Sequence, residues 1–307
     1  MDKVMEEYIS NLDLGPVTEY DDMTVIPIFS PITGPNYMTL REAMEKDLLL
    51  ITEVDEEGSV GELLVKNLAD IPVLLLDGEE IIEAKQNRVL NTTILVGPGE
   101  EIPIPVSCTE QGRWAYKSRR FSDSDDVAAH RVRRSKSASV KDSLRREGQF
   151  RSDQREVWNE IYCLSVDAEV HSSTQAMKDV YTSRETDLSK YMEAFPHVED
   201  QKGVLVLING EIAGLEVLSS EKAYKLLHDK LIRSYALDAL LSPEKEKDGK
   251  DAVQEAKEFM DKTKKTEESR HKSVGHGCDH RFTGDKLVGS SLTVKDKVIH
   301  SVFFNLA

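Results

Sequence analysis

Polar side chains interrupt an apolar, strand-like stretch in the first third of the chain. The interrupting residues are Lys85, Gln86, Asn87, Arg88 and Asn91. Polar groups in a half-buried sheet cost free energy unless they meet partners or a ligand. In an extended strand Lys85, Asn87 and Asn91 would share one face, and Gln86 and Arg88 the other. We therefore expect one polar set to face a cavity.

A second polar group follows closely and comprises Cys108, Glu110, Arg113 and Trp114. Arginine is the best donor for a planar carboxylate or phosphate, a glutamate beside it is an ion-pair partner or a general base, and tryptophan offers a stacking surface. Together these residues suit an anionic, nucleotide-like ligand. The alternative is a buried polar network that holds two hairpins together.

Three residues are candidates for catalysis, namely Glu79 and Glu110 as acid or base and Cys108 as nucleophile. A catalytic thiol needs a nearby base or cation to form its thiolate, and no histidine lies near Cys108 in the sequence. The alternative role of Cys108 is to fill the core as a small apolar residue.

A weaker pattern occurs at residues 275–282. His276, Cys278 and His280 alternate, so on a strand they would point to one face and could bind a metal. No fourth ligand is evident, and we predict no metal there beyond these weak candidates. Asp279 and Arg281, on the other face, suggest an ion pair or a part of the polar site.

Strand-like runs separated by turn signals must position these residues. The runs span residues 23–29, 48–54, 61–67, 71–82 and 92–108. Asp77-Gly78 and Asn209-Gly210 each separate two apolar runs, as in two-residue hairpins, and a weaker third instance turns at Asp296-Lys297. The repeated pattern is consistent with an internal duplication; chance similarity between apolar hairpins is the alternative.

Helical patterns occupy the middle and the second half of the chain. The Ser-rich, basic stretch 118–150 has few large apolar residues and predicts a mobile or surface-lying segment with little core. Helices are expected from Asp153, around Leu188, after Ser220 and from Ala252, with a charged linker at 242–250 and strands over 273–305.

These elements predict an α+β fold with an antiparallel, hairpin-rich β core and with helices of the C-terminal half packed on the sheets. We expect one domain over residues 1–307. Its regions would be a β-rich half (1–117), a basic loop and helical insertion (118–200) and a second α/β half (201–307).

Composition excludes several classes of protein. The net charge of −16 argues against general nucleic-acid binding, although residues 112–155 hold thirteen Lys or Arg against six Asp or Glu. No apolar run approaches the roughly 18 residues of a membrane-spanning helix, and the N-terminus lacks a signal-peptide pattern. With three cysteines and no CxxC spacing, we expect reduced thiols and a cytoplasmic location.

Three unusual strings resemble the ARG and Rhodanese-Phosphatase-superfamily-associated Protein domain, a family of largely uncharacterised prokaryotic proteins. They are LLLDGEEIIEAKQNRVLNTTILVGPGEEIPIPVSCTEQGRW (74–114), RSDQREVW (151–158) and the GxGxDxR pattern that begins at Gly275. The resemblance extends over most of the chain. Matched by motif, it implies the site residues Glu79, Gln86, Arg88, Asn91, Cys108, Glu110, Arg113 and Trp114, with Gln154, Asp279 and Arg281 as secondary members.

The family's name records an association with ADP-ribosylglycohydrolase-type and phosphatase-type domains, which implies a link to ADP-ribose, NAD-derived or other nucleotide metabolism. One hypothesis is thus an enzyme or ligand-processing domain for a nucleotide-like molecule. The other is a non-catalytic metabolite-binding or regulatory protein whose polar cluster is structural. The sequence leaves the cofactor unknown, and it contains no GxGxxG or GxxxxGK[ST] loop.

Overall fold

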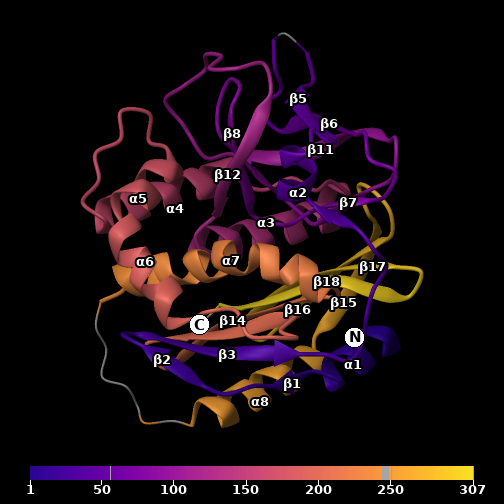
Figure 1. The fold of residues 1–307 in the computed structure, drawn as a ribbon, viewed down its shortest axis with the longest axis vertical. Helices are drawn as coiled ribbons and strands as arrows, with labels where there is room; N and C mark the ends of the chain where they lie inside the picture. Colours follow the sequence, from indigo (N-terminus) through magenta and orange to yellow (C-terminus); the bar gives the residue numbers. More distant parts are fainter. Residues whose placement is uncertain (56, 244–248, 250, 307) are drawn as a thin grey trace. The chain divides into compact units, whose positions relative to one another are not determined.

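The chain forms two compact units in a computed structural model that describes residues 1–55, 57–243, 249 and 251–306. The first unit comprises residues 1–35, 186–272 and 277–307, and the second unit comprises residues 36–185 and 273–276. Over the described residues, the two units contain eight helices and eighteen strands (Figure 1).

An antiparallel sheet of nine strands, counted over the described residues, forms the centre of the first unit. Its order is β1-β3-β13-β14-β18-β17-β16-β15, with β2 paired to β3. The helices α1 and α8 share a core with the sheet through Tyr8 and Phe259, which cluster with Leu205 and Phe303. The helix α7 lies on the opposite side of this sheet (Figure 1).

The strands of the first unit are β1 (Asp13–Leu14), β2 (Thr18–Tyr20), β3 (Met23–Phe29), β13 (Gly203–Ile208), β14 (Glu211–Leu218), β15 (Glu267–Lys272), β16 (Cys278–Gly284), β17 (Leu287–Val294) and β18 (Lys297–Asn305). Its helices are α1 (Lys3–Ser10), α6 (Glu185–Ala194), α7 (Glu221–Leu241) and α8 (Ala252–Lys264).

Two smaller sheets build the second unit. The six-stranded sheet has the order β12-β8-β9-β11-β6-β5, and the three-stranded sheet the order β10-β7-β4. The pair β4–β7 is parallel, whereas the other strand pairs of the described chain are antiparallel. Aliphatic side chains such as Leu63, Ile81, Leu90 and Ile104 form its core.

The strands of the second unit are β4 (Met38–Thr39), β5 (Leu49–Glu53), β6 (Glu62–Asn67), β7 (Val73–Leu75), β8 (Glu79–Glu83), β9 (Arg88–Leu90), β10 (Ile94–Val96), β11 (Glu101–Cys108) and β12 (Phe121–Val127). Its helices are α2 (Leu40–Glu45), α3 (His130–Glu147), α4 (Gln154–Asp167) and α5 (Met177–Ser183). The predicted α+β class with an antiparallel, hairpin-rich core is confirmed.

Two predicted helix starts are confirmed by their capping side chains. Asp153 accepts hydrogen bonds from the backbone N–H groups of Arg155 (2.9 Å) and Glu156 (3.4 Å) at the start of α4. At the start of α7, Ser220 accepts one from Ala223 over 3.2 Å. Such a cap satisfies an otherwise unpaired helical N–H group and stabilises the helix by about 1 kcal/mol.

Two of the three predicted hairpins are confirmed. Asn209 and Gly210, with φ of 52° and 78°, connect the paired strands β13 and β14. The positive φ at both positions is what a tight two-residue turn requires. The β17–β18 hairpin turns at Lys295 and Asp296, one residue before the predicted position, because Val294 pairs with Lys297.

The hairpin predicted at Asp77-Gly78 is wrong. A turn is present, since the Glu79 N–H donates to the Leu76 carbonyl over 3.1 Å. However, the strands on its two sides separate: β7 pairs with β10 and β4, while β8 pairs with β9 and β12. The turn therefore connects two sheets, and its comparison with Asn209-Gly210 gives no support to an internal duplication.

The Ser-rich stretch 118–150 also differs from expectation. It contains β12 and the eighteen-residue helix α3. Eight residues of α3 are buried, among them Val132, Val140 and Leu144. The prediction that this stretch contributes little to the core is therefore wrong. The physical reason is that buried Lys136 pairs with Asp77, a partner 59 positions away that composition does not reveal.

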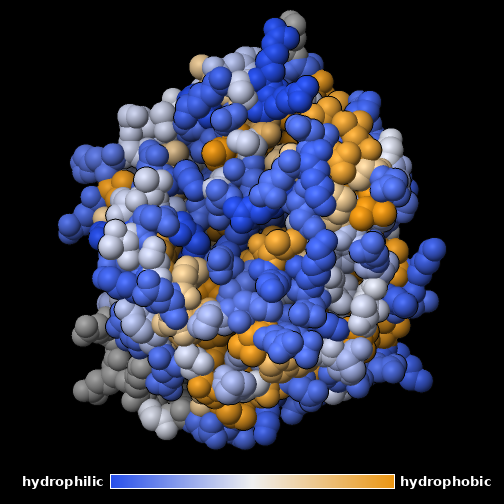
Figure 2. Space-filling view, viewed as in Figure 1, coloured by the Kyte–Doolittle hydropathy of each residue, from blue (hydrophilic) through white to orange (hydrophobic). Residues whose placement is uncertain are grey.

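Among the helices of the described chain, none combines the length and the apolarity needed to cross a bilayer. The face shown in Figure 2 presents mainly hydrophilic residues with hydrophobic patches between them. Most of the charged linker expected at 242–250 lies outside the described residues.

Candidate functional site

Arg88 and Cys108 form the centre of the candidate site in the second unit. They are paired across β9 and β11, so their side chains lie on the same face of the six-stranded sheet. Both are fully buried. The Nη1 group of Arg88 donates to Gln86 Oε1 over 2.9 Å, whereas its Nε and Nη2 groups meet no hydrogen-bond acceptor in the described residues.

Burial controls the protonation of this pair. It raises the pKa of the Cys108 thiol above its ordinary value, although the neighbouring Arg88 charge acts in the opposite direction. Burial also lowers the pKa of Arg88, against the effect of Cys108 and Glu53. The structure thus supplies the cation that a reactive thiol needs, but desolvation outweighs it and favours the neutral thiol.

Glu110 and Arg113 form a two-point ion pair close to this centre. Arg113 donates to the Glu110 carboxylate from Nε (2.9 Å) and from Nη2 (2.6 Å). Its other hydrogen bonds hold two loops together, with acceptors Ala84 O, Ala115 O, Glu83 O and Asn87 Oδ1. Burial opposes the ionisation of Glu110, but the hydrogen bonds from Arg113 and Thr174 outweigh it and lower the pKa of the carboxyl group.

Aromatic rings and cations meet on the open side of the site. The Lys85 ammonium lies 5.4 Å from the ring centre of Trp114 and 5.0 Å from that of Tyr116, and the Arg88 guanidinium carbon lies 5.6 Å from Trp114. These distances are within the range of cation–π attraction. Trp114 and Tyr116 are 47% and 48% exposed, so a ring from solution can reach them.

Gln154 and Asn91 hold the strand that carries Cys108. The Gln154 side chain accepts from Cys108 N–H (2.7 Å) and donates to Cys108 O (2.9 Å), as a neighbouring strand would. Asn91 accepts from the Ser107 hydroxyl over 2.6 Å and donates to Phe150 O over 3.1 Å. Both residues therefore position the backbone around Cys108.

Glu79 has a local partner. Its carboxylate accepts from the backbone N–H of Leu76 over 2.8 Å and is fully buried. Glu79 thus closes the Asp77-Gly78 turn, because its side chain satisfies a backbone donor within that turn.

Sequence reasoning missed a buried carboxyl pair, Glu80 and Asp126. Thr109 donates to Glu80 over 2.6 Å, and Lys178 of α5 donates to Asp126 over 2.5 Å. Burial raises the pKa of Glu80 to about 8, and the Asp126 charge acts in the same direction. The sequence signal for a buried carboxyl group was a second glutamate, Glu80, inside the apolar run 71–82. No sequence pattern connects Glu80 with Asp126.

Asp279 and Arg281 belong to the first unit. Arg281 donates to Asp279 from Nε (2.6 Å) and Nη2 (2.9 Å), and both side chains are buried. This is the ion pair that the sequence offered as one of two readings. The pair lies within the first unit, between alternate positions of β16.

The alternating residues His276, Cys278 and His280 have different surroundings. His276 belongs to Ser273–His276, the short second-unit segment between β15 and β16, where its Nε2 lies 3.0 Å from Glu100. In the first unit, His280 contacts Glu268 and Thr293, each at 2.8 Å.

The grouping of potential metal ligands in the described chain is Asp2, Glu268 and His280, whose ligand atoms lie within 4.8 Å of one another. Arg270 forms ion pairs of 2.7 Å with both of these carboxylates. The guanidinium thus already supplies positive charge to this group, as expected for a structural ion-pair network.

Comparison with known proteins places the chain in a family. No curated protein and no solved structure matches it. A family model matches residues 11–304, which is nearly the whole sequence. The chain therefore belongs to the family described as the ARG and Rhodanese-Phosphatase-superfamily-associated Protein domain.

Proposed function

We propose that the second unit binds a small anionic molecule through Arg88, and that binding rather than catalysis is the main role of the polar cluster. The observation that carries this proposal is that the Nε–H and Nη2–H groups of Arg88, although fully buried, find no acceptor in the described residues. A buried donor without a partner costs about 1–3 kcal/mol. An anion that accepts from both groups would recover this free energy.

Two other arginines indicate what this pair of groups binds. Nε and Nη2 lie on the same edge of the guanidinium and form a fork that fits two oxygens of a carboxylate or phosphate. Arg113 holds Glu110 with this fork, and Arg281 holds Asp279 in the same way. By analogy, the Arg88 fork suits a carboxylate or phosphate of a ligand.

The aromatic surface supports a ligand that also carries a ring. Trp114 faces Arg88, and Trp114 and Tyr116 flank Lys85 with about half of their surface exposed. A base or another flat ring can stack on such a surface while its anionic group reaches the guanidinium. This arrangement fits a nucleotide-like molecule of the ADP-ribose or NAD-derived kind that the family's association implies.

The states of the three predicted catalytic residues favour binding. Cys108 is a buried thiol with a raised pKa, Glu110 is ionised and held by Arg113, and Glu79 closes a turn. The surroundings of Cys108 do not favour a thiolate, and those of Glu110 do not raise the pKa of its carboxyl group towards neutral pH, as nucleophilic or general-acid catalysis would require.

Calorimetric titration with ADP-ribose tests the proposal. We expect saturable binding to the wild-type protein, and a loss of affinity of at least about tenfold in Arg88→Lys, which retains the charge but lacks the fork. Arg119→Lys, an exposed position in the same unit, is the matched control and should bind normally. Inorganic phosphate as a second probe shows how much the anion contributes without a ring.

The outcomes separate clearly. Equal binding by wild type and Arg88→Lys would exclude Arg88 as the anion site. Absence of binding of both probes to the folded wild-type protein would favour the structural alternative, in which the Trp114 ring and the charges of Glu53 and Glu110 stabilise the Arg88 cation within the protein.

One observation favours an enzymatic role instead. A carboxyl group that remains protonated near pH 7 can act as a general acid, and Glu80, beside Asp126, has this property. On this alternative, ADP-ribose would be converted by the wild-type protein and left intact by Glu80→Gln. Chromatography of the reaction mixture decides the question, since an unchanged substrate with wild type excludes turnover of this molecule.

A further inference from the structure

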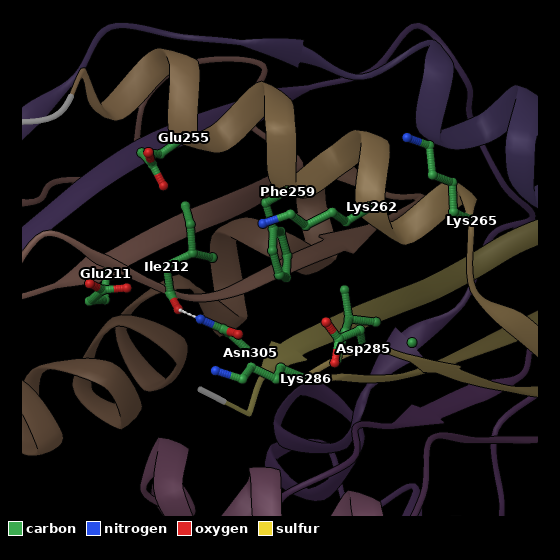
Figure 3. A pocket seen from close by; sticks show the side chains of 11 residues that line it. Glu211, Ile212, Glu255, Phe259, Lys262, Lys265, Asp285, Lys286 and Asn305 are labelled. Carbon is green, nitrogen blue, oxygen red and sulfur yellow. Dashed lines mark hydrogen bonds between the residues drawn. The ribbon is translucent and has the colours of Figure 1, made fainter.

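A pocket of about 530 Å³ lies in the first unit, independent of the site proposed above. Figure 3 shows its position between α8, the start of β14 and the turn that connects β16 with β17. Its volume falls in the range of about 300–1,000 Å³ that is typical of small-molecule sites.

The floor of this pocket is apolar and rigidly supported. Ile212, Phe259 and Leu287 line it and are 7%, 5% and 3% exposed. All three also belong to the hydrophobic core of the first unit, so they are held in place without a ligand. An apolar side chain placed against this floor would be shielded from water at no cost of reorganisation.

Charges of both signs surround the floor. Glu255 and Lys262 leave α8 on the pocket side, and Asp285 and Lys286 come from the β16–β17 turn (Figure 3). None of these four side chains forms a hydrogen bond or an ion pair with another described residue. Opposite charges therefore line one pocket without neutralising each other.

Glu255 and Lys262 leave α8 from separate turns, seven residues and about 10 Å of helix axis apart. An acid and a base thus reach the pocket from two points of the same helix. The two ends of an extended dipeptide are about 7 Å apart, and these long, flexible side chains can adjust to meet both ends.

We propose that this pocket binds a zwitterion of dipeptide size with an apolar side chain. The ligand carboxylate would meet Lys262 and Lys286, the ammonium group would meet Glu255, and the side chain would lie on Phe259. This assignment uses the apolar floor and both signs of charge. A simple anion would leave Glu255 facing a like charge or no partner.

Calorimetric titration of the full chain with glycyl-L-phenylalanine tests the proposal. We expect saturable binding, weakened at least about tenfold when the peptide N-terminus is acetylated and when its C-terminus is amidated. Equal binding of the free and the blocked peptides would overturn the zwitterion, and absence of binding of the free peptide would overturn the site.

Substitutions at exposed or half-buried positions outside the hydrophobic core locate the binding. Lys262→Gln should weaken the binding of the free peptide but leave the binding of the amidated peptide unchanged, because the amidated peptide has no carboxylate. Glu255→Gln should weaken the binding of the free peptide but leave that of the acetylated peptide unchanged, because the acetylated peptide has no ammonium group. Lys264→Gln is the matched control, because Lys264 is on the same helix but pairs with Asp261 and does not line the pocket. If the control weakens binding as much as Lys262→Gln, the assignment is wrong.

Discussion

Gln154 binds both backbone groups of Cys108 through its side-chain amide, at 2.7 Å and 2.9 Å. A residue at the first turn of α4 thereby takes the place of a neighbouring strand at the end of β11. The helix and the sheet are connected at the residue that pairs with Arg88.

Gln154→Leu should destabilise the protein by about 1–3 kcal/mol, because it leaves a buried backbone N–H and a carbonyl without partners. Urea unfolding measures the change. Gln149→Leu, the same substitution at an exposed position nearby, should change the free energy of unfolding by less than about 0.5 kcal/mol. Equal effects of the two substitutions would show that the hydrogen bonds to Cys108 contribute nothing specific.

Arg113→Ala should cost roughly 3–5 kcal/mol of stability, because it leaves the buried Glu110 carboxylate without its counter-charge. The loops around Ala84 and Ala115 also lose their shared donor. Thermal unfolding without any ligand measures the loss, with the exposed Arg119→Ala as control. If the unfolding midpoint of Arg113→Ala is close to that of wild type, Arg113 is not needed for stability and is available to bind a ligand.

The stability of the protein should depend on pH through Glu80. Its pKa is about 8 in the folded state and near 4.5 when exposed, so the folded state holds an extra proton between these values. The contribution of Glu80 to the free energy of unfolding is fully present below about pH 4.5, and it is lost as the pH rises towards 8. In Glu80→Gln, the slope of the unfolding free energy should change by up to about 1.4 kcal/mol per pH unit. Identical slopes in both proteins would place the Glu80 pKa near its ordinary value.

Cys108 should react slowly with thiol reagents in the folded protein, because burial both shields it and raises its pKa. Partly exposed Cys163 provides the internal comparison. Peptide mapping after brief treatment with a maleimide at pH 7.5 should show modification at Cys163 first. Faster modification of Cys108 would indicate an activated thiolate and support the nucleophile hypothesis.

Local signals predicted much of the fold. Asp153 and Ser220 cap helices because an N-cap acts within three residues, and Asn209-Gly210 makes a hairpin because its strands pair with each other. Asp77-Gly78 carries the same local signal, yet its strands join different sheets. Turn chemistry determines the bend, whereas the competition among all strands determines the partners.

The sequence predicted one contact of the candidate site, but it did not predict which donors of its arginines meet acceptors. The string from Cys108 to Trp114 places Glu110 and Arg113 within reach of each other, as the sequence suggested. The hydrogen bonds of the two guanidinium groups depend on contacts that the local sequence does not show. Arg113 donates to acceptors from two loops, whereas Arg88 donates, within the described residues, only to Gln86 and Asn87. The Lys136–Asp77 and Lys178–Asp126 pairs join residues more than fifty positions apart, so no local pattern could reveal them.

The segment Ser273–His276 determines the order in which the chain can complete its structure during synthesis. It belongs to the second unit, where the His276 N–H donates to the Leu95 carbonyl over 2.8 Å. A nascent chain that has left the ribosome only to residue 185 lacks this last contribution. The second unit therefore cannot be completed until most of the first unit has been translated.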